Sequence, residues 1–142
     1  MIKFANYFED NYRYTLYSLV YKKIETTSES NSSTLCINDD IRVEKSSASI
    51  NCYYKRVITL NPEMEFYLEV EYKIIYDALD KVDISSLTED EIRESIYSDA
   101  DVLNELNQVA SHMSLIIAQT LNNGNHDPLV LPPRVFVDQP NE

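Results

Sequence analysis

Glycine is almost absent from this chain, since Gly124 is the only one in 142 residues. The glycine-rich loops that cradle phosphate groups need several glycines close together, because their backbone must approach the ligand closely. The sequence therefore excludes nucleotide-binding loops of that kind. Tight two-residue hairpin turns also favour glycine at positive φ, so we expect few of them.

Basic residues and long apolar runs are scarce as well. Lys and Arg total 12 against 24 Asp and Glu, which gives a net charge of −12. Such a chain is repelled by nucleic acid and by anionic membranes, so the charge disfavours both as partners. No stretch approaches the roughly 18 apolar residues of a transmembrane helix, and residues 1–10 lack the apolar run of a signal peptide. We therefore expect a cytoplasmic protein with no membrane insertion.

Cysteine occurs twice, as Cys36 and Cys52. Two cysteines allow one disulfide but make no disulfide framework. Two reduced thiols in a cytosolic protein are the simpler interpretation.

Tyrosine, by contrast, is abundant, with 11 Tyr against 4 Phe and no Trp. A tyrosine ring is apolar with a polar tip, so it suits half-buried positions and protein interfaces. The length fits one domain, and no repeat or linker divides residues 1–142. We expect the tail at residues 138–142 to be frayed.

Alternating apolar residues predict strands over the first half of the chain. The clearest pattern covers residues 63–76, where apolar side chains alternate with mostly acidic ones. Residues 12–24 instead carry apolar groups on both faces, with Tyr12, Tyr14, Leu16 and Val20 on one and Tyr17, Leu19 and Tyr21 on the other. A strand of that kind is covered on both sides. The predicted strands are residues 12–24, 37–44, 50–60 and 63–76, with a polar loop at 26–34 and turns at 46–49 and 61–62.

Helical signals begin at Thr88. The run Thr88-Glu89-Asp90-Glu91 is a capping box, and it predicts a first helix over residues 89–97. Ser98-Asp99 begins a second, longer helix that ends near the Asn122-Asn123-Gly124 stop signal. The proline pair then predicts an extended segment at residues 128–137. This order indicates an α+β fold, with an antiparallel sheet of about four strands followed by helices packed on one face.

The sequence offers little for catalysis. His112 and His126 lie in no metal-ligand spacing such as HxxxH or CxxC, so structural roles are favoured for both. Ser111 precedes His112, but neighbours on a helix point to different faces, so the pair is no evidence of a catalytic dyad. We expect no enzyme, no catalytic residue, no cofactor and no bound metal.

The acidic side of the 63–76 strand needs its own explanation. Residues i and i+2 on a strand project to one face about 6.5–7 Å apart, so Glu63, Glu65, Glu69 and Glu71 form a stripe. Two carboxylates at that distance could serve glycoside hydrolysis, but acid–base work needs an apolar pocket that raises one carboxyl pKa, and this face is polar. A solvated face is the plainest interpretation. The functional interpretation is a docking surface for a basic partner at Tyr67, Glu69 and Glu71.

A tyrosine-rich strand is followed by a strand ending in Val57-Ile58-Thr59-Leu60, the strand Phe66-Tyr67-Leu68-Glu69-Val70, a long helix, and Leu129-Val130-Leu131-Pro132-Pro133-x-x-Phe136. Over residues 12–137 this order and pattern resemble the SecB-like protein-export chaperones. The resemblance implies a sheet with helices on one face, dimers that pair into a dimer of dimers, and long apolar grooves that hold unfolded polypeptide. It also implies an acidic sheet face that docks the motor SecA, with Tyr67 and Glu69 among the contacts.

We therefore expect an ATP-independent chaperone, a holdase, that binds unfolded or extended polypeptide clients in export or for a specific client. The alternative is an interaction or structural subunit without chaperone activity, such as an antitoxin-like or mobile-element protein. Tyr17, Tyr21 and Tyr53 are the predicted client-binding residues, because they are aromatic positions outside the cleanest apolar register. A first strand with apolar groups on both faces also predicts a homo-oligomer, either a dimer or a tetramer.

Overall fold

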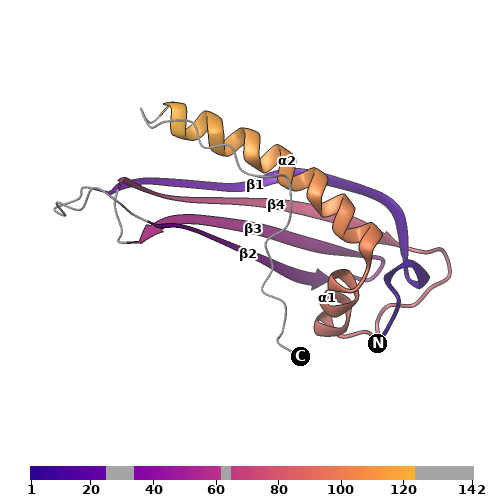
Figure 1. Ribbon diagram of the computed structural model, residues 1–142. Helices are drawn as coiled ribbons and strands as arrows, with labels where there is room; N and C mark the ends of the chain where they lie inside the picture. The colour runs from indigo at the N-terminus through magenta and orange to yellow at the C-terminus, as the bar shows by residue number, and fades with distance from the viewer. Residues whose placement is uncertain (25–33, 62–64, 124–142) are drawn as a thin grey trace.

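The computed structural model describes residues 1–24, 34–61 and 65–123, and it has one antiparallel sheet with helices on one side (Figure 1). The predicted α+β fold is confirmed. Most of the predicted loop at 26–34, together with His126, the segment 128–137 and the tail, lies outside the described residues. The elements are η1 (Phe4–Asn6), β1 (Phe8–Ile24), β2 (Thr34–Lys45), β3 (Ser49–Asn61), β4 (Glu65–Ala78), α1 (Glu89–Tyr97) and α2 (Ala100–Asn123).

The strands lie in the order β1-β4-β3-β2, and every neighbouring pair is antiparallel. Strands β2, β3 and β4 form a meander, whereas β1 pairs with β4, which follows it by more than 40 residues in the sequence. The turn between β2 and β3 is closed by the Ser46 amide, which donates to the Ser49 carbonyl at 2.9 Å. Strands β1 and β2 are therefore the two edges of the sheet.

A β-bulge interrupts β1 at its centre. Leu16 pairs with Tyr72 and Ser18 with Glu71, so Tyr17 is an extra residue opposite a continuous partner strand. An extra residue bends the strand and shifts its side-chain alternation by one.

The bulge corrects one prediction about β1. After it, Leu19 pairs with Val70 and Tyr21 with Leu68, both on the face that carries the helices. Leu19 and Tyr21 therefore lie on the same face as Tyr12, not on the opposite face. The prediction was wrong because it assumed an uninterrupted period of two.

Both helices begin at a side-chain cap. The Thr88 hydroxyl accepts the Glu91 amide at 3.1 Å and donates to the Glu91 carboxylate, so α1 begins where the capping box predicts. Asp99 caps α2 by accepting the amides of Asp101 and Val102 at 2.9 and 3.2 Å. Of the described helices, none has the length and apolar character needed to cross a membrane.

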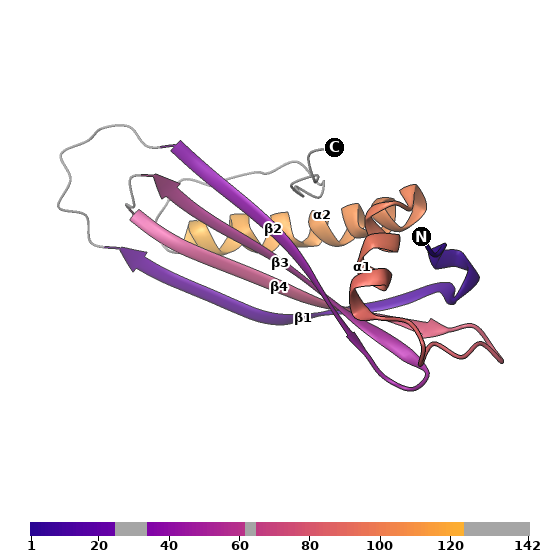
Figure 2. The same ribbon diagram turned by 90° about the horizontal axis from the view of Figure 1, so that it is seen from below.

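Helix α2 runs along the face of the sheet, and α1 lies at one end of it, near the end of β2 and the N-terminus (Figures 1 and 2). The contact between α2 and the sheet is largely apolar, and it includes Leu106, Val109 and Met113, all buried. Three tyrosine hydroxyls form hydrogen bonds that join α2 to β1 and β4. The Tyr76 hydroxyl bonds to Glu105 at 2.8 Å. On β1, the Tyr12 hydroxyl bonds to Gln108 at 2.5 Å and the Tyr14 hydroxyl to His112 at 2.7 Å.

A charged pair lies inside this apolar core. Arg56 donates from Nε and Nη2 to the Asp39 carboxylate at 2.9 and 3.0 Å, and both side chains are fully buried. The Tyr54 hydroxyl donates to the same carboxylate at 2.7 Å. Burial, followed by the nearby Asp39 charge, raises the pKa of Tyr54, so the tyrosine stays neutral and holds its hydrogen bond.

Candidate functional site

The helices cover one face of the sheet, here called the inner face, and the other is called the outer face. By alternation along the registered strands, the outer face carries five basic and five acidic side chains among the described residues. They are Arg13, Lys22, Arg42, Lys55 and Lys73, and Asp40, Glu44, Glu69, Glu71 and Asp77. In a chain of net charge −12, this face is electrically balanced.

The predicted docking residues lie together on the outer face of β4, but their acids are paired. Lys55 lies 2.9 Å from Glu69 and 3.7 Å from Glu71, and Arg42 lies 3.7 Å from Glu71. Glu71 is buried, so a solvated acidic stripe is the wrong description at that position. The prediction missed this because the basic partners come from neighbouring strands, which the alternation of one strand does not reveal. Glu63 and the side chain of Glu65 lie outside the description.

Tyr67 contributes its ring to the same face. The Lys22 ammonium lies 5.7 Å from the ring centroid, at cation–π distance. Tyr67 is partly buried.

The three predicted client-binding tyrosines do not form one surface. Tyr17 and Tyr53 meet on the outer face, with ring centroids 4.9 Å apart, and the Arg42 guanidinium lies 4.2 Å from the Tyr53 ring. Tyr53 is only 6% exposed, whereas Tyr17 is 55% exposed. Tyr21 lies on the inner face and packs against the core. Of the three, Tyr17 alone offers a large exposed ring.

Other exposed apolar side chains lie at the centre of β1 and on α2. Leu16, Leu19 and Leu115 are 41%, 43% and 62% exposed. The contacts of α2 with Tyr12 and Tyr14 set its alignment on β1. Leu115 is two residues from both Met113 and Ile117, which are buried, so its side chain points away from the sheet. The sequence showed both β1 leucines, but the exposure of Leu115 could not be read from its place on an apolar helix.

The excess negative charge lies at the end of the molecule that holds α1. Residues 80–105 contain nine acidic and two basic residues. Burial raises the pKa of Glu105 most, and the nearby charges of Asp10, Asp99 and Asp101 raise it further, against a lowering by the Tyr76 hydrogen bond. A basic partner would therefore meet its strongest attraction here and not on the outer face.

Metal sites and reactive thiols are two further possibilities in the described part of the chain. No group of three His, Cys, Asp or Glu side chains there is placed to hold a metal ion. Burial raises the pKa of the Cys52 thiol to about 12, so this thiol is unreactive at neutral pH.

No protein-family model matches the chain, and no curated protein matches its sequence. A solved structure does match its fold: the Mycobacterium tuberculosis Rv1957 SecB-like chaperone, in complex with a ChAD peptide from the Rv1956 HigA1 antitoxin. The TM-score is 0.61 at 9% sequence identity, and the match covers 89% of this chain and 86% of the other. The fold is SecB-like. This agrees with the resemblance drawn from the order of strands and helix, and β1 is an edge strand of the described sheet.

Proposed function

We propose that this protein is an ATP-independent chaperone that holds unfolded or extended polypeptide. The observation that carries the proposal is the exposed apolar centre of edge strand β1, where Leu16, Tyr17 and Leu19 occur within four residues. A contiguous apolar surface on a folded protein marks a binding site for another polypeptide. The SecB-like fold, and the peptide bound to the solved SecB-like chaperone, support the same proposal.

Clients of this surface are segments that carry several apolar side chains in extended conformation. Leu16 and Leu19 lie on the inner face, so a client would lie along β1. The attraction is apolar, and moderate salt will therefore change client affinity little. Tyr17 extends the surface onto the outer face, where its ring contacts the Tyr53 ring edge-on.

We also propose that two copies pair through β1. Among the described residues, β1 is an edge strand that pairs with β4 on one side and with no strand on the other. Acidic residues Glu9 and Asp10 lie at one end of β1, and Lys22 and Lys23 lie at the other. Antiparallel pairing about the bulge would place Asp10 opposite Lys23 and Tyr12 opposite Tyr21, with each pair on the inner face. Opposite charges in cross-strand positions stabilise such a pair.

Pairing of this kind would also complete the client surface. The inner-face leucines of both β1 strands would form one floor, and the two α2 helices would flank it. Each copy then contributes half of the site, which agrees with the oligomer that the sequence predicts.

Holding activity is tested by the aggregation of an unfolded model client, without nucleotide, at several-fold molar excess of this protein. We expect suppression by the wild type and a clear loss with Leu19→Gln, which removes one of the exposed leucines of β1. Leu35→Gln is the matched control, because Leu35 is an exposed leucine on the opposite edge strand. If the wild type leaves aggregation unchanged, the chaperone proposal fails and the interaction or structural subunit takes its place.

Pairing is tested by light scattering on charge-reversed variants. We expect the wild type to exceed the 16.5 kDa of one chain. The double variant Lys22→Glu, Lys23→Glu should dissociate, and adding Glu9→Lys, Asp10→Lys should restore pairing. A wild type of single-chain mass, or reversed charges without effect, would contradict pairing through β1.

Docking of a motor at Tyr67, Glu69 and Glu71 stays a prediction. The ion pairs of both glutamates leave little free charge for a basic partner, so the contact would rest mainly on Tyr67. A Tyr67→Ser variant that binds a SecA-type motor as well as the wild type would exclude this surface.

A further inference from the structure

The Tyr14–His112 pair lies beside the exposed apolar part of β1. The Tyr14 hydroxyl lies 2.7 Å from Nδ1 of His112, and the two ring centroids are 5.3 Å apart. Tyr14 precedes Leu16 by two residues on the inner face, so the two positions lie about 6.5–7 Å apart along the strand. His112 is exposed, whereas Tyr14 is half-buried. A polypeptide that lies along β1 would therefore meet this pair.

Neither element carries a permanent charge near the pair. Residues 14–21 of β1 and residues 106–123 of α2 contain no Asp, Glu, Lys or Arg. A charged client residue that loses its water here would find no permanent counter-charge in these segments. An imidazole is the side chain that ordinarily changes its charge between about pH 5 and 8. His112 is the one histidine in the two segments, so it alone can bring such a charge to this surface.

The titratable groups around His112 belong to three elements. From β1, Tyr14 contacts the imidazole directly, and its ring centroid lies 6.0 Å from that of Tyr12. From β4, the Tyr72 ring centroid also lies 6.0 Å from that of Tyr14. Burial raises the pKa of Tyr12 and of Tyr72, so both hydroxyls are neutral near pH 7. On α2 itself, Glu105 lies about two helical turns before His112.

Protonation of His112 changes what the pair can donate. In the neutral tautomer with its hydrogen on Nε2, the Tyr14 hydroxyl donates to Nδ1. A proton added at Nδ1 reverses this bond, because Nδ1–H then donates to the Tyr14 oxygen and the contact is kept. The hydroxyl hydrogen of Tyr14 is thereby freed for another acceptor. The protonated pair thus offers a positive charge and two donors, Nε2–H and the Tyr14 hydroxyl.

We propose that this pair, once His112 is protonated, binds the carboxylate of an acidic residue in a client segment that lies along β1. The two oxygens of a carboxylate match the two donors, and its charge matches the imidazolium. The inference rests on the proposed holding of polypeptide and adds a choice of client to it. Uncharged segments bind alike at neutral and at mildly acidic pH, whereas acidic segments bind better when the pH is mildly acidic.

The test compares two peptides that differ in one residue. They are Thr-Val-Leu-Glu-Leu-Val-Thr and the same peptide with Gln in place of Glu, each amidated and labelled with an uncharged fluorophore. Anisotropy gives the Kd of each peptide at about pH 5.5 and about pH 8, where the Glu side chain of a free peptide is ionised. For the wild type, the preference for the acidic peptide should be about three to ten times greater at the lower pH.

Three variants separate His112 from the other groups that titrate. His112→Gln keeps a good helix former and never carries the charge, so most of the pH dependence should disappear. Glu105, whose pKa burial raises, stays in this variant, so its share of the pH dependence is measured there. His112→Lys should prefer the acidic peptide at both pH values. Tyr14→Phe keeps the ring but removes one donor, so it should lower the preference at the acidic pH and leave binding of the uncharged peptide unchanged.

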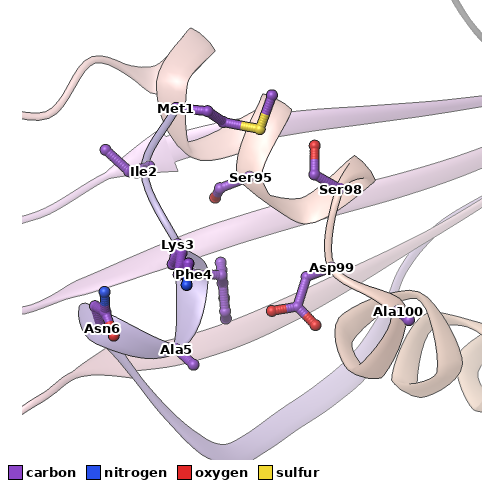
Figure 3. Close-up of a pocket in the computed structure, with 10 residues that line it drawn as sticks. All are labelled: Met1, Ile2, Lys3, Phe4, Ala5, Asn6, Ser95, Ser98, Asp99 and Ala100. Atoms are coloured by element: carbon purple, nitrogen blue, oxygen red, sulfur yellow. The ribbon is translucent and has the colours of Figure 1, made fainter.

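A lysine elsewhere in the molecule is the matched control for a fixed charge. Lys3 lines a pocket of about 470 Å³ between the N-terminal segment and the junction of α1 and α2, together with Asp99 (Figure 3). Ala100 lines the same pocket and lies about 18 Å from His112 along the helix axis. Lys3→Gln should therefore leave the pH-dependent preference at the wild-type level. His126→Gln removes the other histidine and should do the same.

Two results would overturn the inference while leaving the proposed function in place. Equal pH dependence in the wild type and His112→Gln would assign the effect to other groups. A His112→Lys variant without preference for the acidic peptide at about pH 8 would show that no client carboxylate reaches this position. If the uncharged peptide fails to bind the wild type at either pH, the chaperone proposal fails and this inference fails with it.

Discussion

Asp39→Asn should be one of the costliest single substitutions in this protein. The Asp39 carboxylate accepts hydrogen bonds from Tyr54 and from two nitrogens of Arg56, at 2.7, 2.9 and 3.0 Å. Asparagine keeps the shape but removes the charge, and the guanidinium stays fully buried. Breaking a buried pair from one side costs about 3–5 kcal/mol, because the remaining charge loses its counter-ion. For a chain of this length that corresponds to a fall in Tm of roughly 10–15 °C.

The matched control is the next residue along β2. Asp40→Asn makes the same chemical change at an exposed position on the outer face, where surface substitutions stay within about 0.5 kcal/mol. Both variants are compared with the wild type by thermal and urea unfolding at one protein concentration, because pairing of copies would make Tm depend on concentration. Equal midpoints for the two variants would refute the reasoning.

A double variant separates the loss of the pair from the cost of burying it. Asp39→Leu combined with Arg56→Met removes both charges and leaves apolar side chains of similar length. Replacing a buried pair in this way is often neutral or stabilising. The double variant should therefore be more stable than Asp39→Asn alone. A double variant that is less stable would show that the pair contributes net stability.

Three further predictions concern the helix, the sheet and pH. Leu106→Asp should unfold the protein by placing a charge in the core. Leu115→Asp, at an exposed position of the same helix, should change the free energy of unfolding by less than about 0.5 kcal/mol, and a similar loss in both variants would mean that the helix faces are reversed. Tyr53→Ser should cost about 3 kcal/mol because its ring is buried, while Tyr17→Ser should leave the Tm nearly unchanged and weaken client holding; circular dichroism melts and the aggregation assay separate the two. Burial raises the pKa of Glu105, so the wild type should gain stability as pH falls through that raised pKa and lose stability as pH rises. Glu105→Gln should flatten this pH dependence. Urea midpoints, measured at acidic and at neutral pH, that shift equally in both proteins would contradict the prediction.

The elements themselves could be predicted from the sequence because their signals are local. The capping box at Thr88 predicted the residue at which α1 begins, and the alternation over residues 63–76 predicted β4, one of the two central strands of the sheet. Each signal occupies one segment, so no knowledge of the neighbours was needed.

The candidate site depends on how separate segments pair and pack, and this pairing was predicted less well than the elements themselves. The bulge at Tyr17 appears only when β1 is registered against β4, and it moves Leu19 and Tyr21 to the inner face. Glu71 looked solvated until Lys55 and Arg42 were placed beside it from β3 and β2. A pattern of period two reports that a strand has two faces, but not which residues cover each face.

The pairing of β1 with β4 has a consequence for folding during synthesis. The first strand ends at Ile24, and its partner ends at Ala78. At about 5–20 residues per second, a ribosome takes roughly 3–11 seconds to make the residues between. The meander of β2, β3 and β4 needs only neighbouring segments and forms by short loop closures. Until β4 has been made, β1 stays unpaired, and its leucines and tyrosines are exposed to water. In that interval the nascent chain itself carries an unpaired apolar strand, the kind of segment that its finished fold is proposed to hold.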